Sequence, residues 1–370
     1  MKIVFLITRS DTIGGAHVHV KDLALKLKHD GHEVVVLIGG NGVFAQILEN
    51  QGIKIKNLKY LKREINPFYD LMAIFEIRKE LKKINPDLFT IHSSKSGILG
   101  RLSAVNFKIP IVFTIHGWSF TEGISFLKRK IFFLLEKILV PLTSKIVCVS
   151  DYDRNLALNL KLTSKKDKII TIHNGIPDLK SFDNMSCFNS SLNIVFLMIA
   201  RFDKQKDHES LLYAVKKIDD VKIDLIGSGN DFERIKNLAK KLKIDERVRF
   251  LGEFLVDEKV FKNYQGYVLI SNWEGLPISI IEAMRAGLPV VSSNVGGCCE
   301  EVFDGFNGFL IPGNNIEILA QKLSILNKDK NLRKIFGEKS RKIYEEKFEF
   351  KKMYNKYIKL YNSLLENKLG

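Results

Sequence analysis

Two carboxylates stand out in an otherwise nearly uncharged segment, SNWEGLPISIIEAMRAGLPVV, which spans residues 271–291. Glu274 and Glu282 have seven residues between them. The apolar run before Glu274 predicts a strand, and Pro277 suits the first turn of a helix that ends near Gly287. Glu274 would then lie on the loop after the strand, and Glu282 in the first two turns of the helix. Two acids placed in this way can contact one extended ligand at separate points, but each can also be a solvated surface residue.

The backbone between the two acids favours an anion. The N–H groups at the start of a helix have no partner within it, and the helix dipole favours negative charge there. We therefore expect a phosphorylated ligand to bind at this turn. Its residues are Gly275, Leu276, Pro277 and Ile278.

Two cations follow another predicted strand, IVFLMIA, at residues 194–200. Arg201 and Lys206 would lie at the carboxyl edge of the same sheet, where two fixed cations can neutralise a diphosphate without a metal. An ordinary basic loop is the alternative. Gly227, in the strand-to-helix turn LIGSGN, would permit close approach of a nucleotide.

The first half of the chain offers a second glycine turn and a histidine. Gly14 and Gly15 would start a helix after the first strand, but the segment lacks the dinucleotide pattern G-x-G-x-x-G. His116 directly follows a strand and should face a cleft between two domains, where a neutral imidazole can hydrogen-bond a sugar; a satisfied loop histidine is the alternative. The other histidines show no zinc spacing, so we expect no metal.

Short apolar runs without polar alternation position these residues, and they alternate with segments of helical period. Such runs are typical of parallel strands buried on both faces. They lie at 2–7, 33–38, 88–91, 111–115, 146–149 and 169–172, and again at 194–200, 222–227, 247–252, 267–271 and 289–293. The pattern predicts two doubly wound α/β domains with a ligand cleft at the carboxyl ends of their strands.

A polar segment rich in serine and asparagine follows residues 173–177 and predicts the linker between the domains. We place the first domain at 1–178 and the second at 190–345. From Asn331 onward the pattern is that of a continuous amphipathic helix. Residues 346–370 are expected to return to the first domain.

Composition limits the class of protein. The 370 residues carry a formal charge of +16, which favours an anionic partner such as a nucleotide, a phospholipid or a nucleic acid. No apolar run reaches the roughly 18 residues of a membrane span, and the first run is too short for a signal peptide. Four cysteines without metal spacing favour a reducing, cytosolic compartment. They are Cys148, Cys187, Cys298 and Cys299.

Residues 123–145 mix a basic cluster at 128–130 with phenylalanine, leucine and isoleucine. This composition is compatible with a helix on an anionic membrane surface. The alternative is a core helix whose basic turn is solvated.

The combined pattern resembles the retaining nucleotide-sugar glycosyltransferases of family GT4, which have the GT-B fold of two Rossmann-like domains that face each other across a cleft, with C-terminal helices packed back on the first domain. The resemblance covers nearly the whole chain, and it implies that the domain at 1–178 binds the acceptor and the domain at 190–345 binds the nucleotide sugar. It implies that Glu274 contacts donor-sugar hydroxyls, Glu282 contacts the ribose, and Arg201 and Lys206 hold the diphosphate. Matching positions in the family are also Gly14, Gly15, His116, Asn174, Gly175, Gly296, Gly297 and Glu300, of which the last five look structural. The family usually has glycine where this chain has Ala200 and Asp207.

Within GT4, the segments FTIHGWSFTEG and VCVSDYDRNLAL look like the bacterial subgroup that builds capsule and O-antigen chains. The resemblance implies a UDP-linked hexose or N-acetylhexosamine donor, an undecaprenyl-diphosphate-linked acceptor, peripheral contact with an anionic membrane and no cofactor. A nucleotide-sugar 2-epimerase of the same fold and a basic nucleic-acid-binding protein are the alternatives. We expect no nucleic-acid partner, because the basic residues are spread along the chain.

Overall fold

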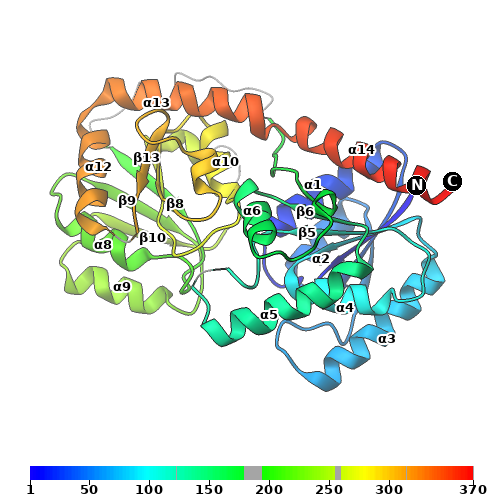
Figure 1. The fold of residues 1–370 in the computed structure, drawn as a ribbon. Coiled ribbons are helices and arrows are strands. Elements are labelled where there is room, and N and C mark those ends of the chain that lie inside the picture. The colour runs from blue at the N-terminus through cyan, green and yellow to red at the C-terminus, as the bar shows by residue number, and fades with distance from the viewer. Residues whose placement is uncertain (122, 179–193, 255–259, 314, 370) are drawn as a thin grey trace. The chain divides into compact units, whose positions relative to one another are not determined.

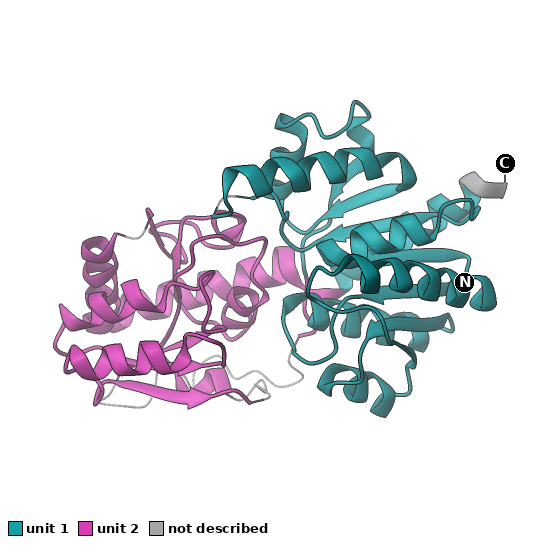
Figure 2. Ribbon diagram, turned by 90° about the horizontal axis from the view of Figure 1, so that it is seen from below, with its two compact units in different colours: residues 1–174, 351–370 teal, residues 175–350 magenta. Residues whose placement is uncertain are grey.

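Two parallel β-sheets organise the chain, one in each of two compact units (Figures 1 and 2). In this computed structural model, unit 1 comprises residues 1–174 and 351–370, and unit 2 comprises residues 175–350. The structure describes residues 1–121, 123–178, 194–254, 260–313 and 315–369. Most of the predicted linker, and Cys187 with it, lies outside the described residues.

The described part of unit 1 has a sheet in the order β3-β2-β1-β4-β5-β6-β7, with parallel pairing throughout. Its strands are β1 (Lys2–Ile7), β2 (Glu33–Gly39), β3 (Lys54–Leu58), β4 (Leu88–His92), β5 (Ile111–Ile115), β6 (Lys145–Cys148) and β7 (Ile169–Thr171). Six of these strands were expected from the sequence. The pattern missed β3, KIKNL, because this edge strand is mostly exposed and lacks a buried apolar run.

Helices cover the unit 1 sheet. They are α1 (Gly15–His29), α2 (Val43–Asn50), α3 (Pro67–Ile84), α4 (Ser94–Ser103), α5 (Phe126–Leu139), η1 (Val140–Leu142), α6 (Asp151–Asn159) and η2 (Lys166–Lys168). The C-terminal helix α14 (Phe350–Leu369) also packs on this unit. Its Tyr354 hydroxyl donates to the Asp30 carboxylate at 2.5 Å, and Tyr357 is fully buried with its hydroxyl 3.4 Å from that of Thr114.

Unit 2 repeats the architecture, with a sheet of described strands in the order β10-β9-β8-β11-β12-β13. The strands are β8 (Val195–Ile199), β9 (Lys222–Ile226), β10 (Val248–Gly252), β11 (Gly266–Leu269), β12 (Val290–Ser293) and β13 (Gly308–Ile311). The helices are α8 (His208–Lys216), α9 (Phe232–Lys241), η3 (Val260–Asn263), α10 (Ile278–Arg285), α11 (Cys298–Glu301), α12 (Ile316–Lys328) and α13 (Lys330–Ile343). The sequence pattern missed β13, GFLI, because its short apolar run begins at a glycine and lies between the turn segments DGFN and PGNN.

The prediction of one continuous helix from Asn331 onward is wrong. Helix α13 is followed by a π-helical turn, η4 (Tyr344–Phe348), and Glu349 is extended before α14 begins. The cause is Ile176, whose N–H donates to the Phe348 carbonyl at 3.0 Å and whose carbonyl accepts from the Phe350 N–H at 2.9 Å. These bonds take the place of hydrogen bonds within a helix. The helical spacing of apolar side chains continues through the break, so the sequence pattern gave no sign of it.

None of the described helices is both long enough and apolar enough to cross a membrane.

Candidate active site

The loops that follow β8 and β11 are joined by backbone hydrogen bonds in unit 2. The Asp207 N–H donates to the Ile270 carbonyl at 2.9 Å, and the Asn272 N–H donates to the Gln205 carbonyl at 2.8 Å. β8 and β11 are neighbours in the sheet, so both loops leave its carboxyl edge side by side. This pairing brings Lys206 next to Glu274.

Lys206 and Glu274 form an ion pair in which the ammonium donates to the carboxylate oxygen Oε1. Their side chains are only 11% and 6% exposed, respectively. Gln205 Nε2 donates to Glu274 Oε2 at 3.3 Å, and the Gln205 carboxamide oxygen accepts from Arg201 at 3.2 Å. Arg201 also pairs with Asp203 at 3.3 Å and is about half exposed. The two predicted cations and the predicted sugar-binding acid therefore belong to one polar network.

Two glycines of the turn after β9 allow it to contact this network's backbone. Gly227 and Gly229 have φ values of +146° and +150°, and a Cβ atom would lie 2.0 Å from the Ala200 carbonyl oxygen in the first case and 2.3 Å from the Phe202 carbonyl oxygen in the second. Glycine is therefore required at these two positions because the loop after β8 packs directly against them. This close packing fixes the backbone around Arg201. Contact between Gly227 and a donor nucleotide stays a prediction.

A third loop supports Glu274 from behind. Gly296 has a φ of +55°, and a Cβ atom there would lie 1.9 Å from the Glu274 carbonyl oxygen. The Gly297 N–H donates to the Gly275 carbonyl at 2.8 Å. This pair of glycines thus holds the backbone on which Glu274 stands, in keeping with the structural role that the resemblance implied.

Helix α10 begins with Pro277 as its N-cap, one residue before the first helical position. Most of the helix is buried, and Ser279 and Glu282 are its two half-buried positions. Residues three apart lie on the same side of a helix, so Glu282 and Ser279 share the accessible side of α10. Gly287, with φ of +69°, follows the end of the helix as the sequence predicted.

Asp207, which stands where the resemblance expects glycine, caps helix α8. Its carboxylate accepts from the Ser210 N–H at 3.0 Å and from the Ser210 hydroxyl at 2.6 Å. An aspartate at this position satisfies N–H groups that the helix itself leaves unpaired. The extra acid near the cations therefore has a local structural role.

In unit 1, Gly14 is the N-cap of α1 and Gly15 is its first residue, as predicted. The Gly14 N–H donates to Nδ1 of His17 at 3.2 Å, and the other ring nitrogen of His17 lies 3.0 Å from the Arg9 carbonyl oxygen. The start of α1 is thereby fixed against the loop that follows β1.

His116 directly follows β5 and meets two histidines that the sequence analysis did not single out. Nδ1 of His92, at the end of β4, lies 3.2 Å from Nε2 of His116, and His19 on α1 packs against both rings. Nδ1 of His19 donates to the Asn174 carboxamide at 3.1 Å. We call His19, His92 and His116 the three-histidine cluster. His92 could have been found from the sequence, because it directly follows the predicted strand at 88–91, as His116 follows the strand at 111–115.

Burial keeps the three-histidine cluster neutral. It lowers the pKa of His19 to about 4, and it lowers the pKa values of His92 and His116 well below the usual histidine range, with a further contribution from the neighbouring ring of His19. Neutral imidazoles accept hydrogen bonds and bind metals, and one nitrogen of each ring lies within 4.8 Å of the others. The absence of a metal from the reaction stays a prediction.

Comparisons with known proteins agree with this arrangement. Residues 13–178 match the family described as Glycosyltransferase Family 4, and residues 189–343 match the family described as Glycosyl transferases group 1. The O-antigen biosynthesis glycosyltransferase WbnH of Escherichia coli is 31% identical over 85% of this chain and 87% of that relative. The chain belongs to glycosyltransferase family 4.

Further relatives of this family 4 glycosyltransferase support the same class and fold. The UDP-Gal:alpha-D-GlcNAc-diphosphoundecaprenol alpha-1,3-galactosyltransferase of Escherichia coli is 29% identical over 83% of each chain. The crystal structure of Anabaena HepE with UDP-glucose has a TM-score of 0.83 at 21% identity, covering 98% of this chain and 100% of that one. The fold is therefore GT-B, as expected. None of these three relatives is named as an epimerase or a nucleic-acid-binding protein.

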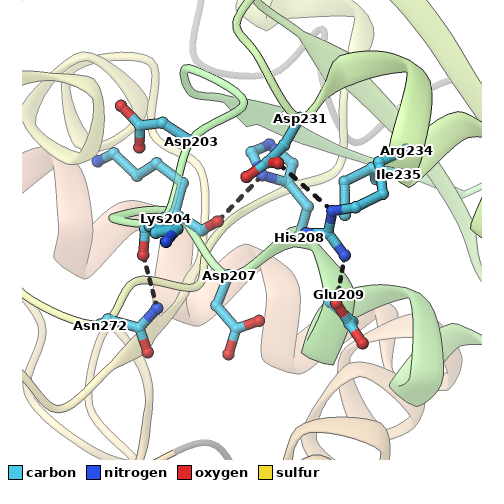
Figure 3. Close-up of a pocket in the computed structure, with 10 residues that line it drawn as sticks. Asp203, Lys204, Asp207, His208, Glu209, Asp231, Arg234, Ile235 and Asn272 are labelled. Atoms are coloured by element: carbon cyan, nitrogen blue, oxygen red, sulfur yellow. Dashed lines mark hydrogen bonds and ion pairs between the residues drawn. The ribbon is translucent and has the colours of Figure 1, made fainter.

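A pocket of about 370 Å³ lies beside the loop after β8, which carries Arg201 and Lys206 (Figure 3). Arg234 spans its wall, donating to Glu209 at 2.7 Å and pairing with Asp231 at 3.4 Å. The residues that line it are Asp203, Lys204, Lys206, Asp207, His208, Glu209, Asp231, Arg234, Ile235 and Asn272. Lys206 is the one predicted site residue among them, and its ammonium is engaged by Glu274. The pocket is therefore a neighbour of the predicted donor site and does not contain it.

Proposed function

We propose that this glycosyltransferase transfers a hexose or N-acetylhexosamine, with retention of anomeric configuration, from a UDP-sugar to a lipid-linked saccharide in O-antigen or capsule synthesis. The observation that carries the proposal is the network of Arg201, Lys206, Gln205 and Glu274 at the carboxyl edge of the unit 2 sheet. The names of the relatives support an undecaprenyl-linked acceptor. HepE, of the same fold, binds UDP-glucose in a crystal structure.

In this proposal Arg201 and Lys206 stabilise the diphosphate as the glycosidic bond breaks. Charge that develops on a leaving group is stabilised most effectively by donors that are already in place. Lys206 is in place because Glu274 holds its ammonium, and Arg201 is tethered through Gln205. No metal or other cofactor is needed for this neutralisation.

The two acids are proposed to bind the donor at separate points. Glu274 would contact sugar hydroxyls, and Glu282, on the accessible side of α10, would contact the ribose. The Glu274 carboxylate is engaged by Lys206 and Gln205, which makes it a poor nucleophile. We therefore propose front-face attack, in which the bond from the anomeric carbon to the diphosphate breaks, the acceptor oxygen bonds to that carbon, and the departing phosphate accepts the acceptor's proton.

Unit 1 is proposed to bind the acceptor, with His116 hydrogen-bonded to a sugar. The protein would act at the inner face of the cell membrane, where a lipid-linked saccharide is available. Nucleic acid is not a partner in this proposal.

The proposal is tested with purified protein and a panel of UDP- and GDP-sugars. Calorimetry should show binding of one UDP-sugar, and slow release of UDP should depend on Glu274. Glu274→Ala should abolish the release, whereas Glu338→Ala, which removes a 62%-exposed acid on α13, should leave it unchanged. Binding of none of the sugars would contradict the proposal. Release of UDP together with a 2-epimerised sugar would favour the epimerase alternative.

A further inference from the structure

Unit 1 exposes large apolar side chains on two of its helices. Phe126 and Leu127 at the start of α5 are each 69% exposed, and Phe68 near the start of α3 is 67% exposed. The apolar face of unit 1, as we define it, consists of Ile65, Phe68, Leu71 and Phe75 on and just before α3, and Phe126, Leu127, Ile131, Leu134, Leu135 and Ile138 on α5. Contiguous exposed surfaces of this kind mark contact with a membrane or another protein.

On α5 the exposed apolar residues form a stripe. Leu127, Ile131, Leu134 and Ile138 are spaced four, three and four residues apart, which places them on one side of the helix. The acid of this helix, Glu136, is buried and pairs with the buried Arg101 at 2.7 Å. The exposed charges of α5 are therefore basic. They belong to Lys128, Lys130 and Lys137. This exposure contradicts the interpretation of residues 123–145 as a core helix.

Helix α3 carries a matching stripe. Phe68, Leu71 and Phe75 share one side of the helix, which continues into the exposed Lys79 and Lys82. Two acids of this helix are held by other partners. Asp70 pairs with Lys95 at 2.6 Å, and Glu76 accepts from the backbone N–H groups of residues 59 and 60. Asp70 and Glu76 are thus engaged within the protein, and Glu80, the third acid of the helix, is half-buried.

The two stripes belong to one side of unit 1. Helices α3, α4 and α5 pack on the same core beneath the sheet, which contains Ala73 and Ile77 of α3, Leu99 of α4 and Phe133 of α5. Helix α4 contacts both of its neighbours and lies between them (Figure 1). Its exposed Leu102 adds an apolar side chain between the stripes.

We propose that the apolar face of unit 1 inserts into the interface of an anionic bilayer. The inference rests on the proposed function, because a lipid-linked acceptor is reached at a membrane. Aromatic and aliphatic side chains bordered by lysines are the chemistry of an interfacial helix, in which apolar groups enter the acyl boundary and cations meet anionic headgroups. The exposed charged residues of α3 and α5 are all lysines, which suits a uniformly anionic surface such as that of a bilayer with anionic headgroups.

The structure assigns this role to two helices instead of the single segment 123–145. Each stripe alone is short, and one helix of 14 residues provides a small contact. Two stripes on one surface bury more apolar area and fix the orientation of unit 1 on the bilayer. Substitutions on α3 should therefore weaken membrane binding as much as substitutions on α5.

The test is co-sedimentation of the full chain with vesicles of phosphatidylglycerol and phosphatidylcholine mixed at about 30:70, which gives the surface a negative potential, with pure phosphatidylcholine as the neutral reference. Ile131→Glu on α5 and Phe75→Glu on α3 should each weaken partitioning by at least about tenfold. Ile335→Glu on α13 of unit 2 is the matched control, because Ile335 and Ile131 are 46% and 49% exposed. It should leave partitioning unchanged, and all variants should keep the far-UV circular dichroism of the parent.

Absence of binding to anionic vesicles, or equal binding of the parent and both variants, overturns the inference. Loss of binding in Ile131→Glu but not in Phe75→Glu overturns the two-helix surface. A dimer that Ile131→Glu dissociates assigns the face to a second copy of the chain and also overturns it. UDP-sugar binding by calorimetry separates this inference from the proposed function: variants that lose vesicles should still bind the donor, whereas a parent that binds vesicles but no nucleotide sugar refutes the proposed function alone.

Discussion

Replacement of Lys206 by methionine tests the core of the proposed donor site. The substitution removes the ammonium and keeps most of the apolar stem. Glu274, which is 7% exposed, then loses its cation and retains the Gln205 amide at 3.3 Å. We expect two separable effects, one on the stability of unit 2 and one on turnover.

The stability effect follows from burial. Removal of one partner from a buried ion pair typically costs about 3–5 kcal/mol, because it leaves a charge uncompensated. The remaining Gln205 contact and the small residual exposure of Glu274 place the expected loss near the lower end, at about 3 kcal/mol. The double variant Lys206→Met/Glu274→Gln removes the stranded charge and should recover most of this loss.

The effect on turnover should not recover in the double variant. Loss of one preorganised donor to a developing negative charge typically lowers turnover by about 10²- to 10³-fold. The assays are urea unfolding monitored by circular dichroism and UDP release from the donor that binds. Lys204→Met is the matched control, because Lys204 is an exposed lysine of the same loop.

Two results would refute the reasoning. Turnover within a factor of a few of the parent in folded Lys206→Met would remove this lysine from the chemistry. A double variant as unstable as the single one would show that the stranded carboxylate of Glu274 is not the source of the instability.

The remaining predictions concern other parts of the same unit and the role of metals. Glu301 is fully buried with neither carboxylate oxygen hydrogen-bonded, and burial raises its pKa well above 4.5. Glu301→Val should therefore stabilise the protein by about 1–3 kcal/mol. Above pH 4.5 the Glu301 carboxyl keeps its proton in the folded state and releases it in the unfolded state, so the parent protein loses stability as the pH rises. In urea unfolding, the stability gained by the variant should therefore be larger at pH 8 than at pH 5. Equal gains at the two pH values would contradict the raised pKa of Glu301. Glu282→Gln should weaken UDP binding in calorimetry, because a ribose contact is present before and during the reaction, and normal affinity would argue against that contact. Gly296→Ala, with a Cβ 1.9 Å from the Glu274 carbonyl oxygen, should displace that acid and lower turnover by about 10²-fold in a folded protein, as measured by UDP release. EDTA should leave turnover unchanged, and a loss that Zn²⁺ reverses would instead implicate the three-histidine cluster.

The interpretation of several segments changed once tertiary contacts were known. Residues 123–145 were compatible with either a core helix or a membrane-surface helix, and the exposure of Ile131 and Leu134 decided against the core. Asp207 departed from the family pattern, and its contacts with Ser210 show that it caps a helix. In each case the outcome depends on which neighbours surround a residue, and sequence spacing does not contain that information.

The sequence by itself determined the strands that are buried on both faces. A parallel strand covered by helices on both sides has apolar side chains at successive positions, and such a run can be recognised in the sequence. It also determined that Arg201, Glu274 and His116 follow such strands, since that needs only the end of an apolar run. Strands β3 and β13 were not predicted, β3 because it is a mostly exposed edge strand and β13 because its apolar run lies between glycine-containing turns.

Only the tertiary structure decided which of these residues meet. Lys206 and Glu274 are 68 positions apart, and they pair because β8 and β11 are neighbours in the sheet. The three-histidine cluster likewise combines α1, β4 and the residue after β5. Strand order and loop packing set such contacts, and they arise from the cooperative burial of the whole sheet, which local residue patterns do not encode.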